Sequence, residues 1–426
     1  MTGDEAVDLT VESIGIRGDG IAEHAGERIF LPLTAPGDRL LAALGARRGE
    51  GRAARVLDLL EPGERAAPIC PHFGSCGGCA LQHLSDRAYA SAKEAWLRAA
   101  LRQHGLPEEP VRPLRRLPAG TRRRARFAVR RPRHDRAAPE IGFHERASHA
   151  IVDIRACAVL HPELLALLAP LRRLAPALWP RGRAGAATAT RADTGVDLLL
   201  DLAAPPGLAA LEAMAEFAAA LDLARLAFRV SGGPPAPVAQ RRPVRISFAG
   251  VAVDLPEEAF LQASAEADAA LTEAVLDCVG GARSIADLFA GFGTFTFALA
   301  RAARVHAVDG FGAAATAIEA ATARAGLAGR IIAERRDLEA RPLLAEELAR
   351  FDAVVFDPPR AGARAQSTQL ARSRVPAIVA VSCNPATFAR DARILIDGGY
   401  RLVAAQPIDC FVWAPQLELV ARFERA

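Results

Sequence analysis

Residues 246–426 alternate between short apolar runs and segments with the periodicity of helices. The apolar runs are, in chain order, SIADLF, RVHAVD, RIIAE, DAVVFD and PAIVAVSC. Strands that alternate with helices in this way predict a doubly wound sheet of parallel strands. Sheets of this kind bind ligands beyond the carboxyl ends of their strands. The residues that follow each apolar run are therefore the candidate site.

Acids, glycines and one cysteine occupy these strand ends. They are Asp287, Gly291, Gly293, Asp309, Asp337, Asp357 and Cys383. Glycines let a ligand approach the backbone closely. An acid that follows such a loop can accept hydrogen bonds from the two hydroxyls of a ribose, and we expect this role for Asp309. Asp337 is expected to accept a hydrogen bond from an adenine amine. A dinucleotide site would look similar, but Thr296 replaces the third glycine of that fingerprint.

The preceding residues show two other patterns. Residues 1–60 carry short alternating runs separated by turn glycines, which predicts a small β-barrel. Residues 61–245 mix a cysteine-rich loop, a basic strand, a hairpin around IGFHERASHAIVDI and helices rich in alanine and leucine. The stretch SGGPPAPVAQRRP is expected to be a loop before the last domain. We therefore expect three domains, over 1–60, 61–245 and 246–426.

Residues 112–136 form a strongly basic segment. They hold 11 arginines and one acid, whereas the whole chain carries a net charge of only +4, so the rest of the chain is acidic. Ala125, Phe127 and Val129 alternate there with charged residues, which predicts a strand with one buried face. The arginines of its other face are Arg124, Arg126 and Arg130. One basic stripe on an acidic protein indicates a polyanionic partner such as RNA, with a merely solvated strand as the alternative.

Three of the seven cysteines lie together in the loop PICPHFGSCGGCALQHL, with the spacing Cys70-x5-Cys76-x2-Cys79. Cysteines that are few and odd in number disfavour a disulfide framework and suit a reducing compartment. The loop is therefore a candidate metal or cluster site. Zinc normally shows two CxxC pairs, or one such pair with two histidines. Because His72 and His83 lie in the same loop, zinc remains an alternative.

Composition excludes a membrane-spanning protein. No run of 18 or more apolar residues is free of charge or proline, and the opening MTGDEAVDLT is acidic, unlike a secretory signal peptide. We expect a cytoplasmic monomer. Lys93 is the only lysine among the 53 basic residues.

Five stretches carry a resemblance to a known family. FDPPRAGA (356–363) and VSCNPATFARD (381–391), together with the cysteine loop, resemble the S-adenosylmethionine-dependent RNA (uracil-5-)-methyltransferases. FLQAS (260–264) is similar to the cofactor segment of that family, and QLELVARFE (416–424) to the stretch that holds its general base. The resemblance covers essentially the whole chain and is closest to the iron–sulfur branch that makes 5-methyluridine in 23S ribosomal RNA.

The resemblance implies a fold and a set of cofactors. The last domain would be a Rossmann-like class I methyltransferase domain, preceded by a TRAM-like barrel that binds RNA and by a mixed α+β domain with a [4Fe–4S] cluster. The cluster ligands would be Cys70, Cys76, Cys79 and Cys157. The residues expected to bind S-adenosylmethionine, by resemblance or by their place at strand ends, are Gln262, Phe289, Gly291, Gly293, Asp309, Asp337 and Asp357. Cys278 and Cys410 are expected to be structural.

The chemistry of such an enzyme requires a nucleophile and a base. Uracil C5 attacks a methyl group poorly until a thiolate adds at C6 and makes C5 nucleophilic. The methylated adduct must then lose its C5 proton to a base before the thiol is eliminated. Cys383, at a strand end, and Glu418 are the residues expected to fill these two roles.

Other functions remain open. A transfer-RNA uridine-5-methyltransferase would share the last domain. A cytosine-5 enzyme would show a Pro-Cys pair in place of Asp357-Pro-Pro-Arg, and amino-group methyltransferases prefer an aromatic residue where Arg360 stands. From a different class, a non-catalytic RNA-binding iron–sulfur protein is possible, although the presence of both Cys383 and Glu418 argues against it.

Overall fold

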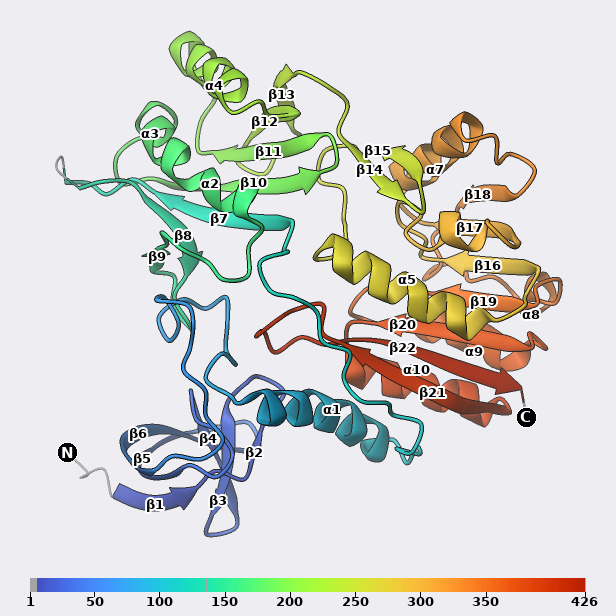
Figure 1. The fold of residues 1–426 in the computed structure, drawn as a ribbon, viewed down its shortest axis with the longest axis horizontal. Coiled ribbons are helices and arrows are strands. Elements are labelled where there is room, and N and C mark those ends of the chain that lie inside the picture. The colour runs from blue at the N-terminus through green and yellow to red at the C-terminus, as the bar shows by residue number, and fades with distance from the viewer. Residues whose placement is uncertain (1–5, 135–136, 426) are drawn as a thin grey trace.

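The computed structural model describes residues 6–134 and 137–425. Residues 1–5, 135–136 and 426, which belong to the predicted barrel, the basic segment and the end of the last domain, lie outside the described residues. Figure 1 shows three lobes, each built on its own sheet, with the first at the lower left, the second above it and the third at the right. No helix in the described ranges is long and apolar enough to cross a membrane.

The first sheet has six strands in the order β1-β5-β6-β4-β3-β2. The strands are β1 (Ala6–Thr10), β2 (Ser13–Ile14), β3 (Gly20–His24), β4 (Glu27–Leu31), β5 (Arg39–Arg48) and β6 (Gly51–Glu61). β4 and β6 run parallel, and the other neighbours run antiparallel. Alternate residues such as Leu9, Ile29, Leu31 and Leu40 point into a common apolar core. The β-rich N-terminal part agrees with the prediction from the alternating pattern.

The second sheet has seven strands in the order β13-β12-β11-β10-β7-β8-β9. The strands are β7 (Arg124–Arg130), β8 (Glu140–His144), β9 (Ile151–Asp153), β10 (Ala184–Ala192), β11 (Gly195–Leu202), β12 (Arg225–Val230) and β13 (Ala236–Gln240). The helices of this part are α2 (Pro162–Ala166), α3 (Leu168–Leu178) and α4 (Leu208–Ala220). Ala125, Phe127 and Val129 of β7 are buried, as their alternation predicts. The predicted hairpin is also present, as β8 and β9.

The stretch SGGPPAPVAQRRP is not only a loop. Its middle forms β13, which pairs antiparallel with β12 at the edge of the sheet. Proline cannot donate a ladder hydrogen bond, but an edge strand has one side without a partner, so Pro237 is tolerated there. The prediction of a loop was wrong because prolines dominate the local signal.

The third sheet has seven strands in the order β18-β17-β16-β19-β20-β22-β21. The strands are β16 (Ser284–Leu288), β17 (Arg304–Asp309), β18 (Ile331–Arg335), β19 (Ala353–Phe356), β20 (Ala377–Ser382), β21 (Tyr400–Ile408) and β22 (Glu418–Arg425). The first five run parallel, as predicted, and β21 and β22 are antiparallel additions. The order of the strands reverses between β16 and β19: β17 and β18 follow β16 on one side, and β19 and β20 lie on the other. Sheets of this kind bind ligands at such a switch point.

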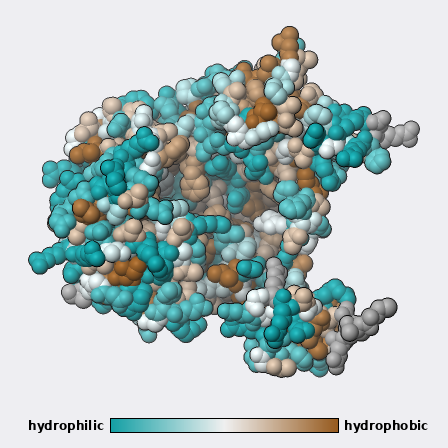
Figure 2. Space-filling view, turned by 180° about the vertical axis from the view of Figure 1, so that it is seen from behind, coloured by the Kyte–Doolittle hydropathy of each residue, from teal (hydrophilic) through white to brown (hydrophobic). Residues whose placement is uncertain are grey.

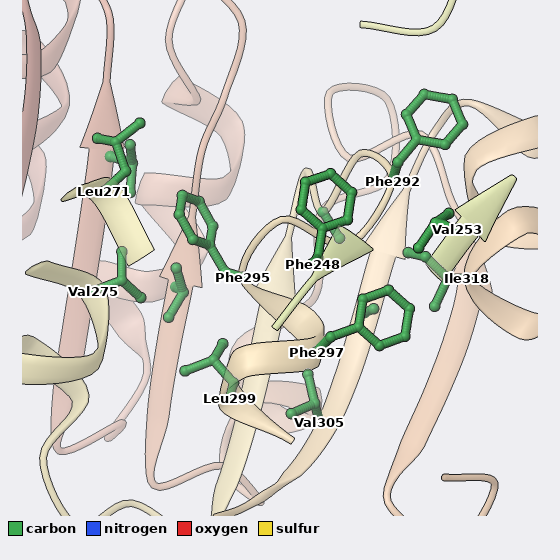
Figure 3. Packing of buried hydrophobic residues seen from close by; sticks show 14 of the residues in the cluster. Phe248, Val253, Leu271, Val275, Phe292, Phe295, Phe297, Leu299, Val305 and Ile318 are labelled. Atoms are coloured by element: carbon green, nitrogen blue, oxygen red, sulfur yellow. The ribbon is translucent and has the colours of Figure 1, made fainter. Parts of the chain in front are cut away.

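Helices cover both faces of the third sheet (Figure 1). They are α5 (Ala265–Val279), α6 (Thr296–Leu299), α7 (Gly312–Arg324), α8 (Ala345–Leu348), α9 (Arg364–Arg372) and α10 (Pro385–Asp397). One core joins α5, α6 and α7 to the hairpin of β14 (Arg245–Phe248) and β15 (Val251–Asp254). Figure 3 shows Phe248 and Val253 of this hairpin beside Phe297 and Ile318. This packing fixes the loop after β16, where the expected cofactor residues begin.

Helix α1 (Asp86–Gln103) joins the lobes. Its C-terminal half packs into the second core of the third sheet through Leu97, Ala100 and Leu101. Tyr89, near its N-terminus, and Trp96, near its middle, pack against residues of the first lobe. The helix lies within the sequence range expected for the middle domain, but its apolar face is covered by the parts of the chain before and after that domain.

Candidate active site

Strand pairing brings Cys383 and Glu418 together. β20 and β22 run antiparallel, and the last residue of β20, Ser382, pairs with Leu419. One step further along both strands stand Cys383 and Glu418. Since residues opposite each other in an antiparallel pair lie within about 5.5 Å at their Cα atoms, a half-buried thiol and a buried carboxyl share one edge of the sheet.

The loop that carries Cys383 is held by side-chain caps. The Asn384 side chain accepts from the backbone N–H of Ala386 and so caps the N-terminus of α10. Its Nδ2 donates to the backbone oxygen of Arg360, 3.1 Å away, and the Thr387 hydroxyl donates to the same oxygen at 3.2 Å. The sequence NPAT thus ties the nucleophile loop to the loop of the DPPR motif.

Charge around Cys383 works against its ionisation. Burial, followed by the Glu418 and Asp357 carboxyls, raises the pKa of the Cys383 thiol to about 11, while Arg360 acts in the opposite direction. Burial also raises the pKa of Glu418 well above its usual range, with a further increase from Asp357. Burial raises the pKa of Asp357 itself to about 7. Two neighbouring carboxyls in a low-dielectric site resist ionising together, so one of them can hold a proton near neutral pH.

Asp357 connects the nucleophile to the FLQAS segment. The side-chain Nε2 of Gln262 donates to Asp357 Oδ2 at 3.2 Å. Gln262 is in turn held by Arg123, whose backbone N–H donates to Ala263 O at 2.9 Å and whose Nε donates to Gln262 O at 3.1 Å. Arg123 also pairs with Asp268 at 2.7 Å and is 4% exposed. An arginine of the basic segment therefore positions an expected cofactor residue.

The glycine loop and Asp309 form a second part of the site. Phe289 and Gly291 both have left-handed backbone, with φ of 58° and 55°. The two carboxylate oxygens of Asp309 accept from the backbone N–H of Gly291 at 2.8 Å and of Phe311 at 2.7 Å. A side chain at Gly293 would meet the Phe297 ring at 2.5 Å, so glycine is required there. Each oxygen of Asp309 keeps a lone pair for a ligand hydroxyl.

The surroundings of Asp287 indicate whether a positively charged cofactor fits beside the glycine loop. It is fully buried, and the Thr296 hydroxyl donates to its Oδ2 at 2.6 Å. Among the described residues, its Oδ1 has no hydrogen-bond partner. Burial, with Asp357 and Asp309 nearby, raises the pKa of Asp287 to about 7. Three acids near one glycine loop suit S-adenosylmethionine, which carries a positive sulfur and an ammonium group.

Asp337 follows β18 beside this loop. A side chain at Gly310, next to Asp309, would lie 3.5 Å from the Asp337 backbone. Asp337 is exposed, and its Oδ1 accepts from the backbone N–H of Glu339 and Ala340. Its second oxygen remains available for a hydrogen bond to an adenine amine.

The four expected cluster cysteines face one cleft of about 590 Å³. They are Cys70, Cys76, Cys79 and Cys157, and all four are half-buried. The cleft is also lined by Gln262, Arg360 and Gln416. Figure 2 shows the back of the molecule hollowed where the lobes meet. Gln262 and Arg360 thus connect part of the chemical site to this cleft, whereas Cys383 and Glu418 are not among its described lining residues.

The thiols interact electrostatically with one another. Burial is the main cause that raises the pKa values of Cys76, Cys79 and Cys157, and each is raised further by at least one other cysteine of the set. The backbone N–H of Gly78 donates to Cys76 Sγ at 3.4 Å, as expected for a glycine that aims its amide at a sulfur. Across the described ranges, no three His, Cys, Asp or Glu side chains are gathered closely enough to hold a single metal ion.

The two nearby histidines have other partners. His72 Nε2 accepts from the backbone N–H of Arg155 at 3.2 Å. His83 is 3% exposed, and its Nε2 bonds Thr34 O at 2.8 Å, in the first lobe. Both rings are therefore engaged in holding loops together, which weakens the zinc alternative.

The arginine face of β7 lines the cleft only in part. Arg124 and Arg126 are among its lining residues, and Arg130 is exposed further along. Arg124 is half-buried and donates to Ala259 O at 3.0 Å. Arg126 and Arg130 are exposed and pair with Asp201 and Glu140.

Sequence reasoning did not include Arg360, Arg123 or Lys93 in the site. Arg360 is part of the DPPR motif, and that motif was a signal for it. Arg123 and Lys93 have no local signal, because their partners lie far away in the chain: Arg123 meets residues 262–268, and Lys93 meets Asp409.

Known proteins that are similar to this chain are RNA methyltransferases. The family model described as tRNA (Uracil-5-)-methyltransferase matches residues 244–425. An "Uncharacterized RNA methyltransferase" of Caulobacter vibrioides is 41% identical over 98% of this chain and 100% of its own. The "23S rRNA (uracil(1939)-C(5))-methyltransferase RlmD" of Dechloromonas aromatica is 34% identical over 97% of this chain and 98% of its own.

A solved structure supports the fold. The tRNA (uracil-54, C5)-methyltransferase of Pyrococcus abyssi, in complex with S-adenosyl-L-homocysteine, has a TM-score of 0.73 and 22% identity. The alignment covers 98% of this chain and 99% of that one.

The family model and the relatives make the chain an S-adenosylmethionine-dependent methyltransferase, and the doubly wound sheet with its glycine loop is the fold expected for one. The chain belongs to the RNA (uracil-5-)-methyltransferase family, as the 34% and 41% identical relatives show over nearly its full length. It therefore methylates uracil C5 in RNA with S-adenosylmethionine as the methyl donor. The alternative of a non-catalytic RNA-binding protein is wrong.

Proposed function

We propose that the chain makes 5-methyluridine in 23S ribosomal RNA, with Cys383 as the nucleophile and Glu418 as the general base. The observation that carries the chemical assignment is the pairing of β20 with β22, which puts these two side chains opposite each other. In the described residues, Cys383 is the only cysteine at the end of a parallel strand of the third sheet.

The steps follow from these two side chains. The Cys383 thiolate bonds to C6 of uracil, and the electron pair of the C5–C6 double bond makes C5 nucleophilic. When bound, S-adenosylmethionine supplies the methyl group that C5 takes up. Glu418 then removes the C5 proton, the C5–C6 double bond forms again, and the bond from C6 to Cys383 breaks. The thiolate is regenerated, and the proton leaves with Glu418.

The environment of Glu418 suits this task. A general base works best when its pKa lies near the working pH. Burial and Asp357 raise the pKa of Glu418, and Arg360 counteracts them. The carboxylate is therefore more basic than an exposed glutamate, yet it has a cation nearby to favour its ionised form.

Residues at the other strand ends would hold the methyl donor. We assign the ribose to Asp309, the adenine amine to Asp337 and the donor's cationic end to Asp287 and Asp357. Gly291 and Gly293 would let the donor approach the backbone. Phe289 and Gln262 would complete the binding surface.

We further propose a [4Fe–4S] cluster on Cys70, Cys76, Cys79 and Cys157. Four half-buried thiols that line one cleft, each within electrostatic reach of others, support it. Zinc draws four thiolates to about 2.3 Å from one centre, whereas a four-iron cluster is larger and accepts a wider arrangement. Within the described part of the chain, no three such side chains are gathered around one point, so the proposal rests on the shared cleft and on the mutual electrostatic effects of the thiols.

The domain limits and the choice of RNA complete the proposal. We propose domains over 1–60, 61–245 and 246–426, the first being a TRAM-like RNA-binding barrel. Ribosomal RNA is supported by the name of the 34% identical relative. Transfer RNA is the second candidate, because the family model and the Pyrococcus structure carry that description.

Mapping of 5-methyluridine decides between these two RNAs. Ribosomal and transfer RNA from cells with and without the gene are digested and compared by mass spectrometry. We expect one 5-methyluridine to disappear from 23S ribosomal RNA and to return when the gene is restored. Loss confined to transfer RNA would overturn the proposed substrate, and restoration by a Cys383→Ala gene would overturn the proposed nucleophile.

A further inference from the structure

Lys93 is the single lysine of the chain, and it is fully buried. The other basic residues, 53 in total with Lys93, are all arginine. Lys93 lies in the middle of α1 with 0% of its surface exposed. A buried ammonium is costly unless it is paired and hydrogen-bonded. The presence of the single lysine at this buried position must therefore be explained by the groups that surround its ammonium.

The contacts of Lys93 supply that reason. Its Nζ lies 2.5 Å from Asp409 Oδ1, 2.8 Å from Gln416 O and 3.2 Å from Phe411 O. An ammonium has three N–H donors in a compact arrangement, and here each has one acceptor. Arginine presents five donors in a larger planar fork, which this enclosed set of three acceptors does not match.

All three acceptors belong to one loop. The segment 409–417 connects β21 to β22, and its two ends meet where Ile408 pairs with Glu418. Lys93 binds the first residue of the loop and also Gln416, two residues before Glu418. It therefore closes the loop at its base, next to the proposed general base.

Tyr89, one helical turn before Lys93, holds the same loop. Its hydroxyl donates to Asp409 Oδ2 at 2.8 Å and accepts from the backbone N–H of Trp413 at 2.9 Å. Trp413 has left-handed backbone, with φ of 57°, a conformation that persists only where the surroundings hold it. Its carbonyl accepts from the N–H groups of Ala80 and Leu81, which directly follow Cys79 in the cysteine loop.

We propose that Lys93 is a positioning residue that sets the place of Glu418, by fixing both ends of the 409–417 loop to helix α1. The helix is a firm anchor because its faces are packed into two cores. The proposal rests on the proposed role of Glu418 as the general base. It predicts that Lys93 affects the release of the methylated RNA more than its attachment to Cys383.

The test follows these two events separately under single-turnover conditions. Enzyme is mixed with RNA and methyl-labelled S-adenosylmethionine. Formation is the appearance of a labelled enzyme–RNA adduct that survives denaturing gels, and release is its conversion to free labelled RNA. In Lys93→Met, we expect the ratio of release to formation to fall about 10-fold or more, since displacing a catalytic group by about 1 Å can cost on the order of 100-fold.

Two further variants keep the test decisive. Lys93→Arg retains the charge opposite Asp409 but not the three-donor geometry, so release should still be selectively slow. Tyr89→Phe leaves the Lys93–Asp409 pair intact but removes the hydrogen bond to the Trp413 backbone, so release should slow selectively but by a smaller factor. If Lys93→Met does not fold, these two variants carry the test.

A matched control separates positioning from simple instability. Arg225 forms a buried pair with Asp197 at 2.7 Å in the second sheet, so Arg225→Met should lower the melting temperature and leave the release ratio unchanged. Equal losses of formation and release in the Lys93 and Tyr89 variants would overturn the proposal. If Glu418→Gln, run in parallel, released product at the wild-type rate, the role of Glu418 itself would be wrong. If Glu418→Gln slowed release but the Lys93 variants did not, only the proposed role of Lys93 would be overturned.

Discussion

The raised pKa of Cys383 predicts a slow reaction of this thiol with alkylating reagents. The thiolate is the reactive form. At about pH 8, a thiol with the ordinary value of 9.0 is about one-tenth ionised, whereas a pKa of about 11 leaves about one-thousandth ionised. In the absence of RNA and cofactor, native Cys383 should therefore react about 100-fold more slowly than the same residue in the denatured chain.

Mass spectrometry resolves this thiol from the other six. Trypsin releases residues 375–390 as the peptide VPAIVAVSCNPATFAR, in which Cys383 is the only cysteine. The rate of iodoacetamide labelling of this peptide is measured across a range of pH in native and denatured protein. Steric shielding lowers the rate by the same factor at every pH, whereas a raised pKa moves the midpoint of the profile. We expect the native midpoint to lie about two pH units higher.

Substitutions identify the groups responsible. Glu418→Gln and Asp357→Asn each remove a carboxyl that raises the pKa of Cys383, so each should move the midpoint to lower pH. Arg360→Gln removes the nearby cation and should move it to higher pH. Arg364→Gln, at the exposed start of α9, is the control and should change nothing. A native midpoint at the denatured value, or no response to the two carboxyl variants, would refute this electrostatic reasoning.

Three other predictions concern the remaining sites. Protein purified without oxygen should be brown and contain about four irons, and Cys157→Ser should lose them; a colourless zinc protein that tolerates this change would contradict the cluster. Replacing Arg126 and Arg130 by glutamine should reduce the slope of log affinity for RNA against log salt concentration by about 1.5 if both meet phosphate, without affecting cofactor binding. An unchanged slope would mean that both only pair with Asp201 and Glu140. Asp309→Ala should weaken S-adenosylmethionine binding about 10-fold or more in calorimetry, because the variant lacks a charged acceptor and leaves the Gly291 N–H without its partner. Unchanged affinity would exclude the ribose role of Asp309.

Local patterns in the sequence predicted the parallel strands and the strand end at which the proposed nucleophile lies. Short apolar runs bounded by turns identify the parallel strands β16 to β20, and Cys383 directly follows the last of them. In β7 the predicted inward residues Ala125, Phe127 and Val129 are buried, since alternate side chains on a strand point to the same face. These features depend on residues that are close together in the chain.

Contacts between distant segments could not be predicted in this way. β22 is the last strand in sequence but lies between β20 and β21, and only this insertion puts Glu418 opposite Cys383. The apolar face of α1 is typical of any amphipathic helix, and nothing in it shows that it joins the third sheet. Arg123 resembles its arginine neighbours in sequence, yet it is buried against Asp268 instead of facing the solvent.

The central claim, that Cys383 adds to the uracil and Glu418 later removes the C5 proton, is tested most directly by trapping the intermediate. Each variant is incubated with RNA and methyl-labelled S-adenosylmethionine, denatured and run on a gel. Glu418→Gln should accumulate a slow-migrating enzyme–RNA band that carries the label, because the methylated base cannot lose its proton. Cys383→Ala should give neither this band nor methylated RNA. Normal turnover by Glu418→Gln, or a labelled covalent band with Cys383→Ala, would contradict the account.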